Sequence, residues 1–175
     1  EATLSSSNVD DDAIGVTIAV YVDGSNNVHT LSAYRTGRGF PNPTLGWGIV
    51  HKTNETVIRT FANQAIGTGG GWSGRSTQIR IERNGNIVRA YTSPLVAGLT
   101  PAPIEPSSMI ELDLSDPANG LTSFMGPQSF GYETLSQPNA SFTALNFTTP
   151  QTNADPDFIY DLHTNTVYSK NPSGV

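Results

Sequence analysis

Short runs in which apolar and polar residues alternate are separated along the chain by Gly, Pro, Asn and Asp. Residues 76–91 are the clearest example, because two alternating runs flank Asn84-Gly85, a dipeptide preferred in two-residue hairpin turns. Residues 14–22 and 28–35 form a second pair around a turn that contains Asp23-Gly24. Residues 14–22 are almost continuously apolar, which predicts a central strand buried on at least one side.

Further strand-like runs follow the same rhythm, and the segments between them are rich in turn residues. They lie at residues 2–5, 47–51, 55–61, 109–114, 135–147, 158–163 and 166–169. No segment combines a 3.6-residue periodicity with a run of Ala, Leu, Glu and Lys, so little helix is expected. The pattern predicts an all-β protein, an antiparallel β-sandwich of about 10–12 short strands.

The composition fits this fold and restricts the partners. Charged residues make up 14% of the 175 positions, and 17 Gly and 12 Pro supply the turns. A chain of this length suits one domain with a full core. The net charge of −6 argues against a nucleic-acid partner, because binding to phosphates needs clustered Lys and Arg. Cys is absent, so neither a disulfide nor a thiolate metal site can form.

The start of the chain and its hydropathy suggest a piece of a secreted protein. The sequence begins at Glu1 rather than Met, and it contains no signal peptide and no membrane-spanning apolar run. We therefore expect residues 1–175 to be a single domain from a longer extracellular protein. Extracellular proteins without disulfides often use bound calcium as a cross-link, because an ion that binds only the native state stabilises it by mass action.

Three consecutive carboxylates, Asp10, Asp11 and Asp12, stand directly before the apolar run at residues 14–22. They repel one another, and a hard divalent cation is the simplest compensation because Ca²⁺ accepts carboxylates in flexible geometry. The alternative is a solvated acidic turn. Calcium needs more oxygen ligands than adjacent side chains can aim at it, and residues 136–141 offer a second oxygen-rich loop. Its Gln137 and Asn139 carbonyls are suitable ligands.

Catalytic motifs are missing, so we expect no enzymatic activity. His29, His51 and His163 lie far apart in the sequence without metal-ligand spacing, and no nucleophile elbow or phosphate loop occurs. The Gly-rich loop at residues 62–75 carries Trp72. Two interpretations of this residue stay open: an exposed Trp that lines a binding surface, or a Trp that tucks into the edge of the core.

The sequence Asp-Asp-Asp-Ala-Ile-Gly-Val at residues 10–16, with an alternating strand that ends in Tyr34-Arg35, resembles a pattern of thrombospondin carboxy-terminal domains. Those domains are concanavalin-like, calcium-binding β-sandwiches of the jelly-roll type. Residues 130–132 and 136–140 are similar to their closing strands. Within that superfamily the chain looks most like the calcium-dependent peptide-binding domain of bacterial repeats-in-toxin adhesins. The resemblance covers residues 8–35 and 124–147, although this chain has less sequence before the triplet.

The resemblance implies a surface Ca²⁺ ion that is only partly coordinated by protein, so that the carboxylate of a peptide's free C-terminus completes the shell. Two groups of residues follow from it. The metal ligands would be Asp10, Asp11, Asp12, Gln137 and Asn139, and the ligand-binding residues would be Gln128, Tyr132, Ser136, Trp72 and Gly71.

The function implied is that of an extracellular adhesion module, a monomeric domain that binds peptide or protein C-termini on a neighbouring cell, with no nucleic-acid partner and no membrane insertion. One alternative is a calcium-dependent lectin of the same fold, in which Trp47, Trp72 and Tyr132 stack on sugars. Another is a structural spacer that calcium only stiffens.

Overall fold

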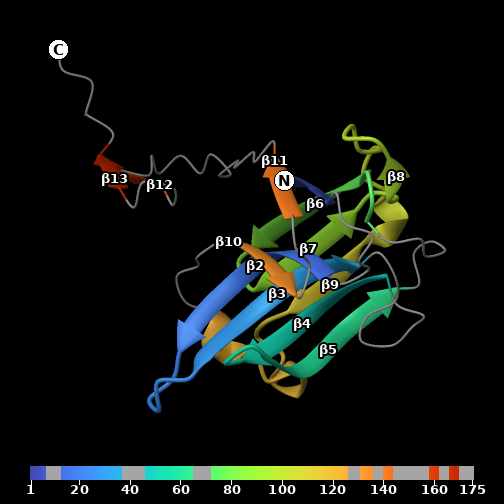
Figure 1. The fold of residues 1–175 in the computed structure, drawn as a ribbon. Helices are drawn as coiled ribbons and strands as arrows, with labels where there is room; N and C mark the ends of the chain where they lie inside the picture. Colours follow the sequence, from blue (N-terminus) through green and yellow to red (C-terminus); the bar gives the residue numbers. More distant parts are fainter. Residues whose placement is uncertain are drawn as a thin grey trace.

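A computed structural model describes residues 1–6, 13–36, 46–64, 72–125, 131–135, 140–143, 158–161 and 166–169. Its strands form two antiparallel sheets that face each other, as the ribbon in Figure 1 shows. Within the described residues the only helical elements are short 3₁₀ turns, at Pro106–Ser108 (η1), Pro117–Asn119 (η2) and Thr122–Met125 (η3). The prediction of an all-β sandwich with little helix is therefore confirmed.

The first sheet has the strand order β11-β1-β6-β7-β9, with β8 paired to β6. Its strands are β1 (Ala2–Ser6), β6 (Arg75–Asn84), β7 (Ile87–Thr92), β8 (Val96–Ala97), β9 (Ile110–Asp113) and β11 (Ala140–Thr143). Every pair in this sheet is antiparallel. The first strand of the chain thus lies between a middle strand and a late one, which local alternation alone does not predict.

The second sheet has the order β10-β2-β3-β4-β5, again antiparallel throughout. Its strands are β2 (Ala13–Val22), β3 (Val28–Thr36), β4 (Trp47–Thr53), β5 (Thr56–Gln64) and β10 (Gly131–Leu135). A separate two-stranded sheet consists of β12 (Phe158–Asp161) and β13 (Thr166–Ser169). No helix in the described part of the chain is long and apolar enough to cross a membrane.

The predicted hairpin at residues 76–91 is present, with its turn displaced by one residue. Asn84 pairs with Ile87, so the two turn residues are Gly85 and Asn86 rather than Asn84 and Gly85. Gly85 has φ +58°, and a positive φ at the first central position alone is the pattern of a type II′ turn. The hairpin of β2 and β3 also agrees with the prediction, with a bulge between Thr17 and Ala19.

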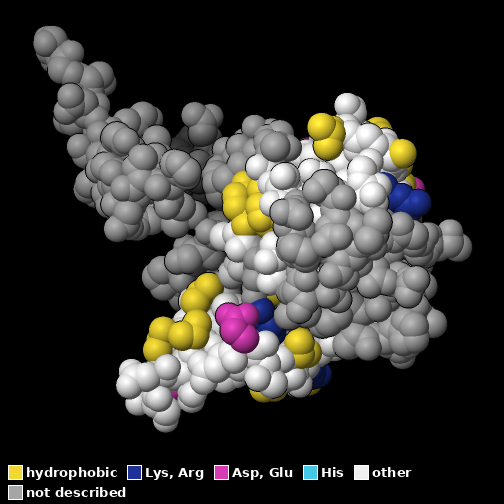
Figure 2. Space-filling model, viewed as in Figure 1, with side chains coloured by type: hydrophobic (Ala, Val, Ile, Leu, Met, Phe, Trp, Pro, Cys, Tyr) yellow, Lys and Arg dark blue, Asp and Glu magenta, His cyan; other side chains and the backbone are white. Residues whose placement is uncertain are grey.

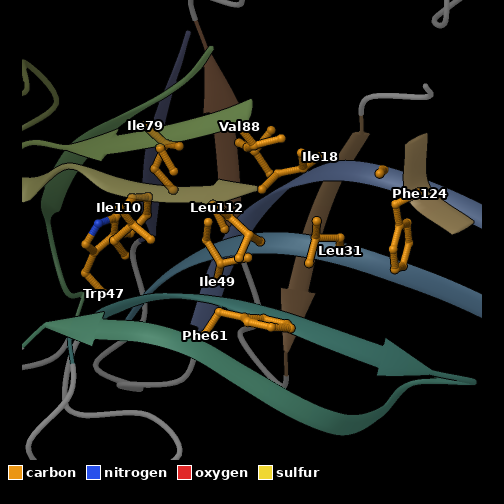
Figure 3. Close-up of a cluster of buried hydrophobic side chains, with 14 of the residues drawn as sticks. Ile18, Leu31, Trp47, Ile49, Phe61, Ile79, Val88, Ile110, Leu112 and Phe124 are labelled. Carbon is orange, nitrogen blue, oxygen red and sulfur yellow. The ribbon is translucent and has the colours of Figure 1, made fainter. Parts of the chain in front are cut away.

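The core fills the space between the two large sheets, as Figure 3 shows. Ile79 and Val88 of the first sheet face Leu31 and Ile49 of the second across this layer. Trp47 lies towards one end of the core, and its Nε1 donates a hydrogen bond of 2.9 Å to the carbonyl oxygen of Ser108. This bond satisfies the buried indole and joins β4 to the segment that precedes β9.

The surface carries few charges, as the composition predicts. On the face shown in Figure 2, acidic and basic side chains occur in small groups among uncharged polar and hydrophobic ones. Apolar side chains gather near the tip of the β2–β3 hairpin, where Val22 and Val28 are exposed. Among the described residues on this face, Lys and Arg form no large cluster.

Candidate functional site

One end of the second sheet collects the points where five strands begin or end. Ala13, the first residue of β2, pairs with Thr36 at the end of β3 and with Leu135 at the end of β10. Trp47, the first residue of β4, pairs with Gln64 at the end of β5. We call this end of the sandwich the loop end, because the segments at residues 7–12, 37–45, 65–71 and 136–139 all leave from it.

The first sheet contributes to the same end. Ser6 closes β1 and pairs with Arg75, the first residue of β6. Ser6 also forms a parallel bridge with Ser73 and accepts a 3.2 Å hydrogen bond from the amide of Gly74. The Gly-rich segment at residues 65–71 therefore ends beside the point where the chain enters residues 7–12.

Two passages of the chain between the sheets start and finish on paired strands. The chain passes from β1 to β2 through residues 7–12, and from β10 to β11 through residues 136–139. Ser5 of β1 pairs with Ser141 of β11 in one sheet, and Ala13 of β2 pairs with Leu135 of β10 in the other. Paired residues of antiparallel strands lie about 4.5–5.5 Å apart. Both passages are thus fixed next to each other at both ends.

The two predicted halves of the calcium site belong to these two passages. Asp12 directly precedes Ala13, and Ser136 directly follows the residue that pairs with Ala13. Most of the predicted site residues lie outside the described residues: Asp10, Asp11, Asp12, Ser136, Gln137, Asn139, Gln128 and Gly71. What the structure describes is the pairing of the strands that flank them.

The beginning of β2 is packed too closely to accept any side chain at Gly15. A Cβ atom there would lie 2.6 Å from the carbonyl oxygen of Ala33 and 2.7 Å from Cδ1 of Tyr34. Ala13, Tyr34 and Val50 form a small buried cluster on the outer face of this sheet. Burial raises the pKa of the Tyr34 hydroxyl far above its usual range. The glycine of the acidic motif is therefore explained by contact with β3.

Arg35 places a buried cation at the loop end. It pairs with Ile14 on β2 and Trp47 on β4, and its side chain is almost completely buried. Its Nη1 donates a 2.9 Å hydrogen bond to the carbonyl oxygen of Gly46. Burial lowers the pKa of Arg35 to about 10, and the charge of Glu105 acts in the opposite direction. The guanidinium remains charged at neutral pH, and Glu105 is the carboxylate whose charge acts on it.

Trp72 corrects one of the expected ligand-binding residues. Its side chain is 0% exposed and belongs to the core, so it lines no ligand surface. The physical reason is the bridge between Ser73 and Ser6, which attaches this part of the chain to the first sheet. The carbonyl oxygen of Trp72 also accepts a 2.7 Å hydrogen bond from the amide of Arg75. Of the two interpretations, the Trp that joins the core is the one observed.

Tyr132 is placed where a ligand can reach it. The residue is 39% exposed, and its ring stacks on Phe142 with centroids 4.2 Å apart and an interplanar angle of 28°. Tyr132 comes from β10 and Phe142 from β11, the outermost strands of the two sheets on this side. The pair closes the side of the sandwich near the loop end with a partly exposed aromatic surface.

A second cluster of polar residues escaped the sequence analysis. His29 and His51, far apart in the sequence, meet with 3.2 Å between Nδ1 of His29 and Nε2 of His51. They lie near the β2–β3 turn, at the end of the sandwich opposite the loop end. His29 lies two positions before Leu31, and His51 two positions after Ile49, so both side chains share the inward face of their strands with a core residue. Their proximity can be predicted only once the β3–β4 register is known.

No family model, curated protein or solved structure matches this chain in comparisons with known proteins. No group of three or more His, Cys, Asp or Glu side chains suited to a metal occurs in the described ranges, which omit the acidic triplet.

Proposed function

We propose that this chain is a calcium-dependent recognition module, with the ion at the loop end between residues 7–12 and 136–139. Asp10, Asp11 and Asp12 supply carboxylate ligands, and Gln137 and Asn139 supply carbonyl oxygens. The observation that supports this most is the double pairing of the flanking strands, Ala13 with Leu135 and Ser5 with Ser141.

The length of the second passage limits how far its oxygens can be from the triplet. Five Cα steps separate Leu135 from Ala140, so these two atoms lie at most about 18 Å apart. Two sheets packed face to face are about 10 Å apart. Residues 136–139 are thus only a few more than the crossing between the sheets needs, which supports placing the proposed amide ligands close to the loop end.

Charge balance also favours a cation. The triplet adds three adjacent negative charges, and the carboxylate whose charge acts on the buried Arg35 is Glu105 rather than a member of the triplet. Burial next to an uncompensated carboxylate is costly unless the charge is paired or coordinates a metal. A Ca²⁺ ion would compensate two of the triplet's charges and accept the mixed set of carboxylate and amide oxygens that the two passages offer.

The ion keeps part of its coordination shell for a ligand. A free peptide C-terminus supplies a carboxylate, which a hard cation binds strongly, and the exposed ring of Tyr132 provides an apolar contact for the residues before it. Gln128, Ser136 and Gly71 complete the wall of the pocket; Trp72 does not take part. In a secreted adhesion protein such a module would bind protein C-termini on a neighbouring cell surface.

A pair of isosteric substitutions tests the ion. We expect the melting temperature of the full chain to rise when Ca²⁺ replaces chelator, and Asp11→Asn with Asp12→Asn to remove that rise. The matched control is Glu82→Gln with Glu111→Gln, which removes the same charge from exposed positions of β6 and β9. Melting that is insensitive to chelator in the unaltered chain would contradict the calcium site.

The ligand is tested separately with pairs of peptides that differ only at the C-terminus. Free acids should bind in Ca²⁺ and lose binding in chelator, whereas the amidated forms should bind weakly in both. Equal binding of acid and amide would refute the carboxylate mechanism while leaving the ion in place.

A calcium-dependent lectin is the second candidate, and the stacked pair of Tyr132 and Phe142 favours it because an exposed aromatic face also suits a sugar ring. A glycan array with and without chelator separates the two. A chain that responds to calcium but binds neither peptide nor glycan would instead be a stiffened spacer.

A further inference from the structure

The end of the sandwich opposite the loop end contains an inward-facing group of aromatic rings. Tyr21, His29 and His51 come from β2, β3 and β4, with Tyr21 paired to His29 and Leu31 paired to His51. The rings of Tyr21 and His29 stack at 4.4 Å with an interplanar angle of 3°. Phe124 of η3 closes the group, with its ring in T-shaped contact with those of Tyr21 and His51. The two imidazoles are therefore held in fixed orientations.

Polar contacts continue the group outwards. Nε2 of His29 lies 3.1 Å from Oδ2 of Asp23, and Nδ1 of the same ring lies 3.0 Å from the hydroxyl oxygen of Thr53 and 3.2 Å from Nε2 of His51. Asp23 also accepts hydrogen bonds from Asn27 and Ser25. These bonds, first that from the Asn27 side chain and then that of His29, hold the pKa of Asp23 well below its usual range. Asp23 is therefore ionised.

The ionised carboxylate determines the tautomer of His29. A carboxylate only accepts hydrogen bonds, so Nε2 of His29 must carry the hydrogen that faces Asp23. In the neutral ring this leaves a lone pair on Nδ1, directed at His51 and Thr53. A carboxylate that binds one nitrogen of an imidazole, with a lone pair on the other nitrogen, is the arrangement that orients histidine for metal binding.

We propose that Nδ1 of His29 and Nε2 of His51 form a binding site for one borderline divalent transition-metal ion, such as Zn²⁺. Two nitrogens bound to a tetrahedral zinc at about 2.0–2.1 Å are about 3.3–3.4 Å apart, close to the 3.2 Å observed here. The hydroxyl of Thr53 and water fill the other positions. The His29 side chain is 14% exposed, so solvent reaches the site.

The same distance also suits a hydrogen bond between the two rings in the absence of metal. The metal-free and metal-bound pairs differ in the position of one proton on His51. In the metal-free pair the hydrogen sits on Nε2 of His51 and points at Nδ1 of His29. In the metal-bound pair it moves to Nδ1 of His51, so both facing nitrogens present lone pairs. In the part of the chain that the structure describes, two imidazoles converge here, fewer than the three or four protein ligands of resident zinc sites, so binding is weaker than in those sites.

Imidazole ligands give the site a different preference from the loop end. They suit Zn²⁺, Cu²⁺ and Ni²⁺, whereas Ca²⁺ and Mg²⁺ prefer oxygen. The histidine site is therefore independent of the proposed calcium site. Titrations in saturating Ca²⁺ keep the oxygen-rich end occupied and report on the histidines alone.

The test is isothermal titration of the full chain with ZnCl₂ in saturating Ca²⁺. His29→Gln and His51→Gln are compared with His163→Gln, which removes the third histidine of the chain. We expect one Zn²⁺ per chain in the unaltered protein and in His163→Gln, and at least about tenfold weaker binding in the other two. Asp23→Asn should weaken binding about 10–100-fold through the loss of the orienting carboxylate.

An NMR titration of the unaltered protein tests the site even if the variants fail to fold. The ring ¹H and ¹⁵N resonances of His29 and His51 should shift on addition of Zn²⁺, and those of His163 should not. Co²⁺ should give the visible absorption bands of a low-symmetry nitrogen site. The proposal is overturned if folded protein takes up no Zn²⁺, or if uptake is unchanged in both His29→Gln and His51→Gln.

Discussion

Replacing Gly15 by Ala tests whether the close contact between β2 and β3 constrains the beginning of β2, which follows the proposed calcium ligands in the sequence. The new Cβ would lie 2.6 Å from the carbonyl oxygen of Ala33 and 2.7 Å from Cδ1 of Tyr34. Favourable contacts between carbon atoms lie at about 3.5–4.0 Å. The strands must therefore separate by close to 1 Å, and one of the obstructing atoms is backbone, which cannot rotate away.

Two effects of opposite sign decide the magnitude. Ala restricts the unfolded chain more than Gly does, which stabilises a protein by about 0.4–1 kcal/mol at a compatible site. Overpacking a close-packed site costs about 1–3 kcal/mol and occasionally more. Because the backbone of Ala33 is fixed by pairing with both β2 and β4, we expect the clash to win. The free energy of unfolding should fall by about 1–3 kcal/mol, or about 2–12 °C in melting temperature.

The assay is urea unfolding followed by circular dichroism, with two glycine controls. A Cβ on Gly24 meets nothing within 4 Å, and one on Gly131 meets only Thr17 at 3.9 Å. Gly24→Ala and Gly131→Ala should stay within about 0.5 kcal/mol of the unaltered chain. If Gly15→Ala is as stable as these two, the contact with Ala33 and Tyr34 does not constrain β2 and the explanation of the motif glycine is wrong.

Three further predictions follow from single residues. Burial, and then the charge of His29, lower the pKa of His51 in the folded chain. Below pH about 6.5, His51 is therefore protonated to a greater extent in the unfolded chain than in the folded one. The free energy of unfolding should fall as the pH drops from about 6.5 towards the pKa of His51 in the folded chain. His51→Gln should reduce this dependence on pH when the free energy of unfolding is measured by urea unfolding at a series of pH values. Trp47 and Trp72 are both buried, so acrylamide should quench the fluorescence of the native chain poorly; quenching typical of an exposed indole would contradict the placement of Trp72. Tyr132→Ala should weaken the binding of peptide acids and leave calcium affinity unchanged, as measured by two separate titrations. If the variant loses both peptide and calcium affinity, Tyr132 instead helps to hold the metal site in shape.

The sequence predicts the local elements well because each hairpin is specified within a few neighbouring residues. The apolar run at residues 14–22, the alternating run at 28–35 and the turn between them give both the strands and their pairing. The order of strands in the sheets is different, since β1 pairs with β11 and β2 with β10 across more than a hundred residues. No local pattern encodes such a contact.

The burial of Trp72 and the contact between His29 and His51 both depend on how distant parts of the chain pair. Trp72 follows a Gly-rich run that reads as a loop, but the bridge between Ser73 and Ser6 attaches it to the first sheet. His29 and His51 are 22 positions apart and meet only because the β3–β4 register places them diagonally. A prediction of the candidate site therefore needed the sheet order first, and the acidic triplet alone could not give it.

The position of the proposed ion predicts how far its effect extends through the molecule. Residues 7–12 and 136–139 each join one sheet to the other, so an ion held between them ties together strands of both sheets. At a calcium concentration 100 times the dissociation constant, binding to the native state alone adds about 2.7 kcal/mol, or about 5–11 °C in melting temperature. Because both sheets are involved, circular dichroism of the strands and fluorescence of the buried Trp residues should shift together with the same midpoint. A shift confined to one probe would mean that calcium orders only a loop, and the ion would then have no part in holding the sandwich closed.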